Sequence, residues 1–161
     1  MGVKTLVAST LMVMSLSASA FASDLYHETT PVFKNTVNGN LLTGKDGLAL
    51  YTFIKDYKQG SIPPKCTTKE DNKPLGSCLA RWPAATVSMV QLKSLTSKDK
   101  AYGGVYNNEL HKLQLTYDGL PVYYWFKDTA KNNFTGDGVG KAWALIEQGK
   151  TPINFSGLNK K

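Results

Sequence analysis

The sequence predicts a single all-β domain, in which two pseudo-symmetric hairpin-plus-loop repeats pack as a small sandwich or barrel. Three observations support this prediction. Residues 45–56 align without gaps with residues 117–128, and six of the twelve positions are identical. Such a match at one fixed offset indicates a duplicated supersecondary unit. Hydrophobic residues also alternate with polar ones over short stretches, and Asn-Gly and Asp-Gly pairs that favour tight turns separate these stretches.

The first repeat is expected to contain three strands joined by two turns. Residues 32–37 and 40–43 form a hairpin, with the Asn-Gly pair at 38–39 as its turn. The Asp-Gly pair at 46–47 makes the second turn, because glycine accepts the positive φ that such turns require. Residues 48–54 then form a strand that carries aromatic side chains on one face.

The second repeat follows a segment with weak helical signals. Residues 88–97 could form a short helix, although its caps are poor, and residues 102–108 read as a loop or a bulged strand. Residues 112–117 alternate strictly, which predicts a strand with one face in water. After the Asp-Gly turn at 118–119, residues 122–126 are all β-branched or aromatic. That strand is either buried on both faces or presents aromatic side chains on an exposed functional face.

The first 22 residues are expected to be a signal peptide. Lys4 supplies a positive charge, residues 5–16 are apolar, and residues 20–22 give an A-x-A cleavage site. The alternative, an uncleaved anchor, would need about 20 apolar residues to span a bilayer. No cysteine directly follows the apolar run, so lipid attachment there is not expected. We therefore expect a periplasmic or secreted bacterial protein that is not membrane-anchored after cleavage.

The rest of the chain has the length of one domain. Residues 23–148 are expected to form the exported β domain, with repeat units at about 32–87 and 104–147, and residues 149–161 to form a polar C-terminal tail. In each repeat the aromatic strand precedes a loop that ends in a tryptophan. This loop is longer in the first repeat.

The charge of the chain limits its partners. The formal net charge is +7, which favours an anionic envelope component or another envelope protein as partner. The lysines are scattered, however, and Arg81 is the only arginine. Nucleic-acid-binding proteins concentrate their positive charge and use arginine. We therefore expect no nucleic acid as partner, and favour a solvated surface over a binding patch.

The two cysteines, Cys66 and Cys78, both lie in the longer loop. An even number of cysteines in an exported protein predicts a disulfide. The alternative is a reactive or metal-bound thiol pair, but the spacing differs from the C-x-x-C pattern of such pairs. We expect the bridge to fasten the enlarged loop rather than to join the two repeats.

Several motifs in chain order resemble those of one known family. They are Tyr-x-Phe-x-x-Asp at 51–56, Cys-x-x-x-Trp-Pro at 78–83, Gln-x-Thr-Tyr-x-Gly-x-Pro-x-Tyr-Tyr at 114–124, Tyr-x-Trp-x-x-Asp at 123–128, and a glycine-rich segment at 136–140 before Trp143. Over about residues 38–147 the chain thus resembles the bacterial "secreted repeat of unknown function" family, whose members are often predicted lipoproteins. The resemblance implies export and a repeated β architecture, but no agreed reaction. The chain lacks the lipobox cysteine of those lipoproteins.

Equivalent positions of the two motifs supply the ligand-binding candidates. These are Tyr51, Phe53, Asp56, Tyr123, Trp125 and Asp128. A facing pair of carboxylates could bind a hard cation or act as acid and base. Alternatively, each aspartate caps the turn after its strand by accepting backbone N–H bonds. The aromatic residues could line a groove that stacks planar or sugar ligands, or pack in the core between the hairpins.

The function predicted from these features is that of a non-enzymatic binding or interaction module with an unknown ligand. His27 and His111 are the only histidines, and no nucleophile elbow is present. No cofactor and no metal site is expected. The alternative is a small envelope redox or metal-binding accessory protein, or an enzyme, that uses the pair Asp56 and Asp128.

Overall fold

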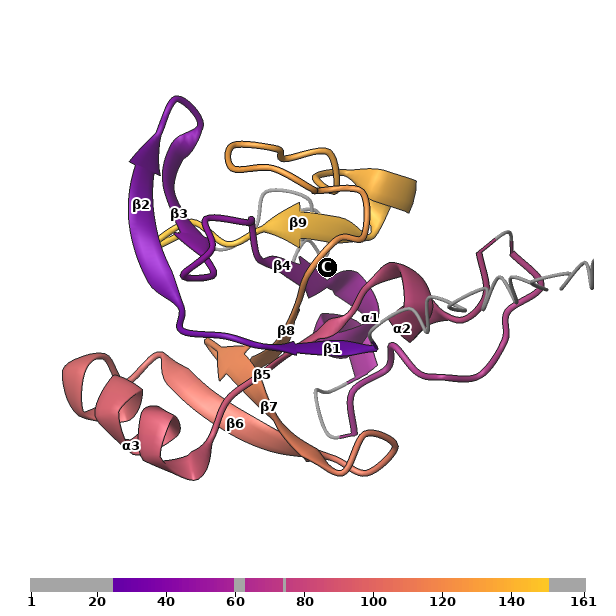
Figure 1. Ribbon diagram of the computed structural model, residues 1–161, viewed down its shortest axis with the longest axis horizontal. Helices are drawn as coiled ribbons and strands as arrows, with labels where there is room; N and C mark the ends of the chain where they lie inside the picture. The colour runs from indigo at the N-terminus through magenta and orange to yellow at the C-terminus, as the bar shows by residue number, and fades with distance from the viewer. Residues whose placement is uncertain (1–24, 60–62, 74, 151–161) are drawn as a thin grey trace, which may run out of the picture.

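The computed structural model describes residues 25–59, 63–73 and 75–150, and it is mostly β (Figure 1). The strands in these ranges are β1 (Tyr26–Glu28), β2 (Val32–Thr36), β3 (Gly39–Thr43), β4 (Tyr51–Phe53), β5 (Ala84–Thr86), β6 (Tyr102–Asn107), β7 (Lys112–Tyr117), β8 (Leu120–Tyr123) and β9 (Trp143–Leu145). The helices are α1 (Ile54–Gln59), α2 (Cys78–Arg81), α3 (Met89–Lys98) and the 3-10 turn η1 (Val139–Lys141).

Seven of these strands form one sheet. Its order is β1-β5-β7-β8-β4-β9, with β6 paired to β7 and a further pairing between β5 and β8. Only the pairing of β1 with β5 is parallel among the strands described here. Strands β2 and β3 form a separate hairpin, at the upper left of Figure 1. The sheets do not close into a barrel, so that alternative of the predicted fold is wrong.

The first repeat forms the predicted hairpin but a shorter aromatic strand. Strands β2 and β3 pair from Val32 with Thr43 to Thr36 with Gly39, and Gly39 has the positive φ of +115° that the turn requires. The strand predicted for residues 48–54 is wrong at both ends, because β4 begins at Tyr51 and α1 begins at Ile54. The carboxylate of Asp56 lies in the first turn of α1, where the helix dipole favours negative charge.

The segment between the repeats is more regular than expected. Helix α3 has a capping box, in which Ser88 Oγ accepts from the Gln91 backbone and Gln91 Oε1 accepts from Ser88 N. The expectation of poor caps was therefore wrong. Strand β6 pairs with β7 over six consecutive positions, so the loop or bulge predicted at 102–108 is an ordinary strand.

Strand β7 lacks the wet face that its alternation predicts. Gln114 is 0% exposed and Thr116 is also buried. The Gln114 amide is satisfied internally, because Asn107 Nδ2 donates to its oxygen at 3.0 Å and its nitrogen donates to the Val122 carbonyl at 3.0 Å. A polar side chain with bonded partners can be buried at little cost, which is why the alternation misled.

The aromatic segment after the Asp-Gly turn is buried on both faces. Strand β8 ends at Tyr123, but Tyr124 N still donates to the Pro83 carbonyl at 2.8 Å. Val122 and Tyr124 belong to one hydrophobic cluster, whereas Tyr123 and Trp125 belong to another. The sheet around β8 and β4 thus separates two cores, and the motif residues Tyr51, Phe53, Tyr123 and Trp125 all lie in the second.

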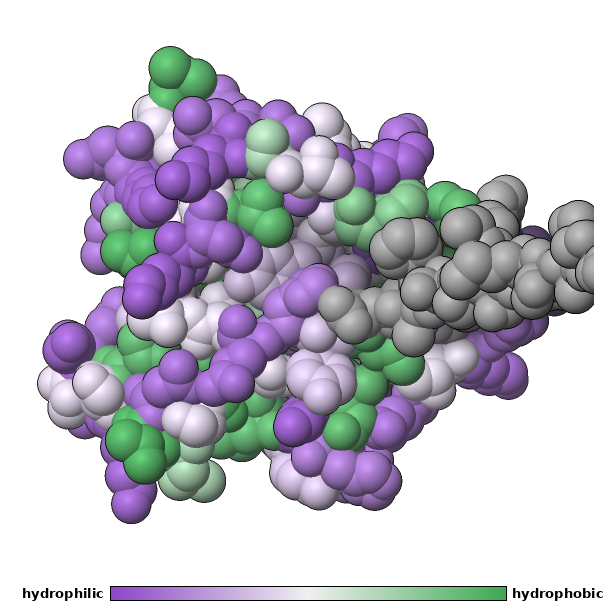
Figure 2. Space-filling view, viewed as in Figure 1, coloured by the Kyte–Doolittle hydropathy of each residue, from purple (hydrophilic) through white to green (hydrophobic). Residues whose placement is uncertain are grey.

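Most of the surface in Figure 2 is hydrophilic, with hydrophobic side chains in scattered patches. One such position is the tip of the β2–β3 hairpin, where Val37 is almost fully exposed. No helix in the described part of the chain is long and apolar enough to cross a membrane. The predicted signal peptide at 1–22 lies outside the described residues, as does most of the predicted tail at 149–161.

Candidate functional site

The tyrosine of each motif donates a hydrogen bond to the aspartate of the other motif. Tyr51 Oη donates to Asp128 Oδ2, and Tyr123 Oη donates to Asp56 Oδ2 at 3.0 Å. The two tyrosines are register partners in the pairing of β4 with β8, and both are 0% exposed. A crossed pair of buried hydrogen bonds therefore joins the two motifs.

Each aspartate also holds the loop that follows it. Asp56 Oδ1 accepts a bond from Lys65 N at 2.7 Å. Asp128 Oδ1 accepts bonds from Thr135 N at 3.0 Å and from Thr135 Oγ1 at 2.6 Å. Both carboxylates are almost fully buried, so they point into separate loops instead of facing each other across an open cleft. This is the geometry of the turn-capping alternative.

Burial raises the pKa of Asp56 and of both tyrosines. The pKa of Asp56 is raised from 3.8 to about 6, mainly because burial removes the carboxylate from water. The N–H of Lys65, the hydroxyl of Tyr123 and the charge of Lys65 act in the opposite direction. Burial and a neighbouring aspartate raise the pKa of Tyr51 and of Tyr123 well above 10. Both tyrosines therefore remain hydroxyl donors at every ordinary pH.

Beside the crossed bonds, five aromatic rings contact one another in a row that we term the aromatic ladder. Phe53 stacks on Trp143 with centroids 4.2 Å apart, and Trp143 stacks on Trp82 at 3.7 Å. Trp82 then packs on Trp125 at 4.1 Å, and Trp125 meets Phe126 edge to face at 4.7 Å. Phe53 and Trp125 thus each pack on the tryptophan that ends the loop of the other motif. Rings in such arrangements stabilise each other beyond the area that they bury.

A lysine stands at each end of the aromatic ladder. Lys55 Nζ lies 5.9 Å from the centre of the Phe53 ring, and Lys127 Nζ lies 5.7 Å from that of Phe126. Contacts of this kind contribute about 0.5–1 kcal/mol at exposed sites. Both lysines directly precede a motif aspartate, so within each Lys-Asp pair the carboxylate is buried while the ammonium group lies at the surface.

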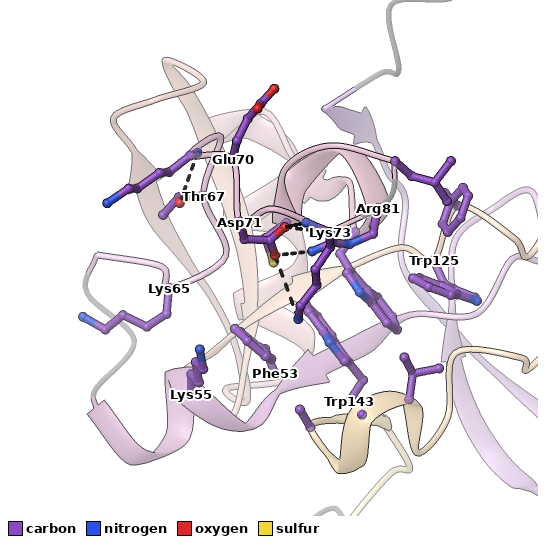
Figure 3. Close-up of a pocket in the computed structure, with 18 of the residues that line it drawn as sticks. Phe53, Lys55, Lys65, Thr67, Glu70, Asp71, Lys73, Arg81, Trp125 and Trp143 are labelled. Carbon is purple, nitrogen blue, oxygen red and sulfur yellow. Dashed lines mark hydrogen bonds and ion pairs between the residues drawn. The ribbon is translucent and has the colours of Figure 1, made fainter.

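The aromatic ladder forms the floor of a groove with a volume of about 710 Å³ (Figure 3). Among the residues that the structure describes, six cationic side chains line this groove together with two acidic ones, Glu70 and Asp71. Asp71 is already bonded to a cation, since it accepts from both terminal nitrogens of Arg81. The fold therefore concentrates positive charge that is scattered in the sequence. The six cations are Lys55, Lys65, Lys69, Lys73, Arg81 and Lys127.

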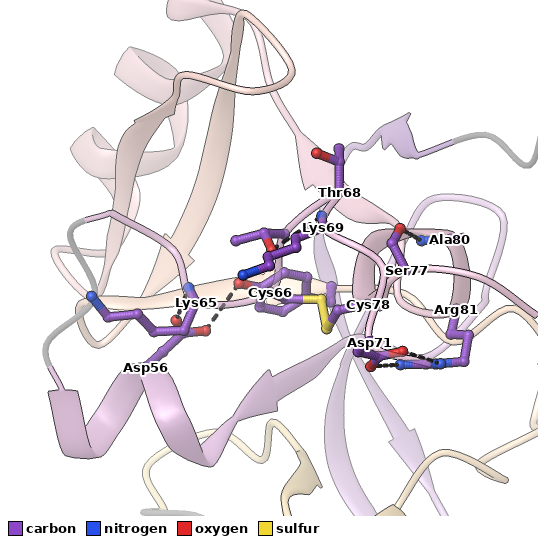
Figure 4. Close-up of a disulfide and its surroundings, with 12 residues drawn as sticks. Asp56, Lys65, Cys66, Thr68, Lys69, Asp71, Ser77, Cys78, Ala80 and Arg81 are labelled. Atoms are coloured by element: carbon purple, nitrogen blue, oxygen red, sulfur yellow. Dashed lines mark hydrogen bonds and ion pairs between the residues drawn. A yellow bond between two sulfur atoms is a disulfide. The ribbon is translucent and has the colours of Figure 1, made fainter. Parts of the chain in front are cut away.

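The predicted disulfide is confirmed and forms part of one wall of the groove. Cys66 and Cys78 are bonded within the loop between Asp56 and Trp82, with their Cα atoms 5.2 Å apart (Figure 4). Cys66 is buried, and it follows the residue whose N–H the Asp56 carboxylate accepts. The bridge therefore fastens the enlarged loop close to its carboxylate anchor, as the sequence predicts.

One donor in the ladder has no acceptor. The indole N–H of Trp125 is buried and finds no hydrogen-bond partner among the residues that the structure describes, although Trp125 lines the groove. A buried donor without an acceptor costs about 1–3 kcal/mol. Thr52 Oγ1 is the other buried side-chain atom without a partner among the described residues.

The described part of the chain contains no cluster of side chains suited to bind a metal ion. Within residues 25–59, 63–73 and 75–150, no group of three or more His, Cys, Asp or Glu side chains is placed to hold a metal ion. His27 instead makes an edge-to-face contact with Tyr124.

Sequence reasoning selected the two tyrosines, the two aspartates, Phe53 and Trp125 as candidates, and the structure places all six in this region, but four further residues were missed. Lys55 and Lys127 were overlooked as groove residues, although their identity at one offset was visible. Trp82 and Trp143 were noted only as loop ends. Their mutual stacking at the centre of the ladder depends on sheet pairing, which no local pattern encodes.

Comparison with known proteins gives one match. Residues 104–146 match the sequence model of a family described as a secreted repeat of unknown function. The matched segment runs from β6 to the end of β9 and contains the second motif and Trp143. The expected resemblance is thus confirmed for this part of the chain. Searches of curated proteins and of solved structures found no match.

Proposed function

We propose that this protein is an exported binding module, on the premise that residues 104–146 match a secreted repeat of unknown function. The family description supports export, and the pattern of residues 1–22 supports a cleaved signal peptide. We place the mature protein in the bacterial periplasm or outside the cell, without a membrane anchor after cleavage.

We further propose that the two motifs are copies of one unit folded against each other. The crossed Tyr–Asp bonds support this, because each contact recurs with the two motifs exchanged. Strand pairing follows the same exchange: Tyr51 pairs with Leu145, and Tyr123 pairs with Ala84. Contacts that recur under such an exchange are those of a two-fold arrangement. The groove then lies where the two copies meet.

The groove is proposed to bind an anionic ligand of the cell envelope. The observation that carries this proposal is the gathering of six cations around an aromatic floor at the junction of the motifs. A cleft lined by one sign of charge raises the local concentration of ligands of the opposite sign. Its volume of about 710 Å³ lies in the range of ligand-binding pockets.

The predicted site residues then fall into two roles. Four of them, Tyr51, Asp56, Tyr123 and Asp128, hold the two loops in place through buried bonds. Phe53 and Trp125 line the groove itself. We propose that the protein acts by binding and without catalysis. The alternative in which the two aspartates bind a metal has less support, because both carboxylates already accept bonds in separate loops.

Binding measurements on matched charge variants test this proposal. We expect acidic polymers to raise the melting temperature of the protein and neutral polymers to leave it unchanged. The double variant Lys55→Ala/Lys127→Ala is expected to lose most of that shift. Lys93→Ala/Lys98→Ala removes the same charge from α3, outside the groove, and should keep the shift. Absence of stabilisation by every polymer, or an equal loss in both variants, would overturn the proposal.

A further inference from the structure

We propose that the groove binds an elongated acidic glycan, which lies along the aromatic ladder and places anionic groups at Lys55 and Lys127 together. This inference rests on the proposed binding function and deepens it. It concerns the class of ligand and the reason why the groove selects a ligand long enough to reach both lysines.

The first argument is the position of the two lysines. They contact opposite terminal rings of the ladder, with Trp143, Trp82 and Trp125 in between. A small anion can neutralise the ammonium group at only one end. A ligand that uses both ends must therefore be extended and must carry at least two separated negative charges.

The second argument is that four of the five rings in the ladder have no open face on which a ligand could stack. Phe53, Trp82, Trp125 and Trp143 are each no more than 8% exposed, because each ring packs against its neighbours in the row. The ammonium group of Lys55 also lies over the Phe53 ring. Proteins that bind single-stranded nucleic acid stack bases on open aromatic faces, and no such face is free on these four rings. A glycan does not depend on such a face, because its hydroxyl and carboxylate oxygens can bind the polar and cationic side chains that line the groove.

The third argument is the type of polar group that lines the groove. Five of its six cations are lysines, which act as mobile point charges and do not impose the planar two-point geometry of arginine. The only arginine is bonded to Asp71. Trp125, which also lines the groove, carries a buried indole N–H that has no acceptor among the described residues. The lysines of the groove therefore suit a glycan chain, which they would recognise by the number and spacing of its negative charges.

Calorimetric titration with ligands of graded length tests the inference. The probes are an oligogalacturonate of about four units, galacturonate itself, a neutral oligosaccharide of equal length, a polyphosphate of equal charge and a single-stranded oligonucleotide. A pocket of this volume accommodates a ligand of about that size. We expect the oligogalacturonate to bind most tightly, with its Kd raised at least tenfold in Lys55→Ala and in Lys127→Ala. The effects of the two substitutions should not add, because either one removes the bridging mode.

The outcomes separate the inference from the function on which it rests. Equal affinity per charge for galacturonate and its oligomer would overturn the bridging inference. If Lys55→Ala/Lys127→Ala nevertheless abolished the binding of both, the proposal that the groove binds anions would still stand. Tighter binding of polyphosphate or of the oligonucleotide would overturn the glycan class. If none of the five probes binds, both proposals fail. Lys93→Ala/Lys98→Ala serves as the control and should match the unmodified protein.

Discussion

Asp56 and Asp128 occupy the same position in their motifs, but the loops that they hold are closed in different ways. Asp56 accepts two hydrogen bonds, and the long loop around it is also closed by the disulfide. Asp128 accepts three, and its shorter loop has no bridge. Instead Gly136 packs so closely that a Cβ there would lie 2.8 Å from the Tyr51 ring.

This difference shows what the arrangement requires of its loops. In both, a backbone N–H must reach the buried carboxylate, because a buried charge needs bonded partners. The short loop reaches it through close backbone contact. The long loop has more conformational freedom to lose, and a covalent bridge reduces that freedom. Close backbone packing in one loop and a disulfide in the other therefore both serve to bring a backbone N–H to the buried carboxylate.

The largest expected effect tests whether Trp82 and Trp143, at the centre of the aromatic ladder, contribute equally to the free energy of unfolding. Trp82→Ala and Trp143→Ala each remove a buried ring that stacks on the other, so both should lower the free energy of unfolding by about 3–5 kcal/mol. Chemical denaturation measures this. The control, Tyr106→Ala at a side chain that is 55% exposed, should change little. A loss below about 1 kcal/mol for only one of the two tryptophans would show that they contribute unequally to stability.

Removal of the disulfide should affect one loop and spare the other. Cys66→Ser/Cys78→Ser opens a bridge between residues 12 positions apart, and the simple chain-entropy account expects a loss of about 3 kcal/mol. Hydrogen exchange should speed up at the Lys65 amide and remain unchanged at the Thr135 amide, relative to global stability. Equal acceleration at both amides would show that the two loops do not behave independently.

The raised pKa of Asp56 predicts a pH dependence that belongs to the first loop. Between pH 3.8 and about 6 the folded state holds a proton that the unfolded state has lost. The stability that this proton contributes, about 3 kcal/mol in total, is fully present below the unfolded-state pKa of 3.8 and is lost as pH rises through the folded-state pKa of about 6. Asp56→Asn keeps an acceptor and removes the titration. The difference between this variant and the unmodified protein, measured by denaturation at several pH values, isolates the effect.

A difference of this kind is needed because another carboxylate also contributes to the pH dependence of stability. Bonding to Arg81 lowers the pKa of Asp71, and its contribution has the opposite sign. A stability difference between Asp56→Asn and the unmodified protein that stays constant from pH 4 to pH 7 would contradict the assignment to Asp56.

The smallest expected effect separates the two crossed hydroxyl bonds. Tyr51→Phe leaves Asp128 with two donors, whereas Tyr123→Phe leaves Asp56 with only the Lys65 amide. Each bond to a buried carboxylate contributes about 1.5–3 kcal/mol, and Tyr123→Phe should lie at the upper end. The same variant should raise the pKa of Asp56 further, which nuclear magnetic resonance titration can follow. A larger loss for Tyr51→Phe would reverse the comparison.

Parts of this fold were readable from the sequence because they depend on near neighbours. The hairpin of residues 32–43 was placed within one residue at each end, since its turn needs glycine with positive φ. The capping box of α3 was also readable from Ser88 and Gln91, but was passed over. The burial of Gln114 could not be read, because its partner Asn107 lies on a regular strand where a loop or a bulged strand was expected.

The arrangement of the candidate site depends on contacts between distant segments. Each tyrosine bonds a carboxylate more than 60 residues away, at separations of 77 and 67 residues. The lysines of the groove come from α1, the disulfide loop and the turn after β8. The repeat at a constant offset showed which residues correspond, but the direction of their bonds follows from how β4 and β8 pair.

The crossed bonding has a consequence for half-molecules. A fragment that ends before β6 keeps Tyr51, Asp56 and the Lys65 amide, but Tyr51 loses its acceptor Asp128 and Asp56 loses Tyr123, one of its two donors. Two such fragments could satisfy one another across a symmetry axis, as in a homodimer. If the two motifs arose by duplication, as we propose, the single-motif ancestor would have been a self-associating peptide, and fusion would have freed its folding from dependence on concentration.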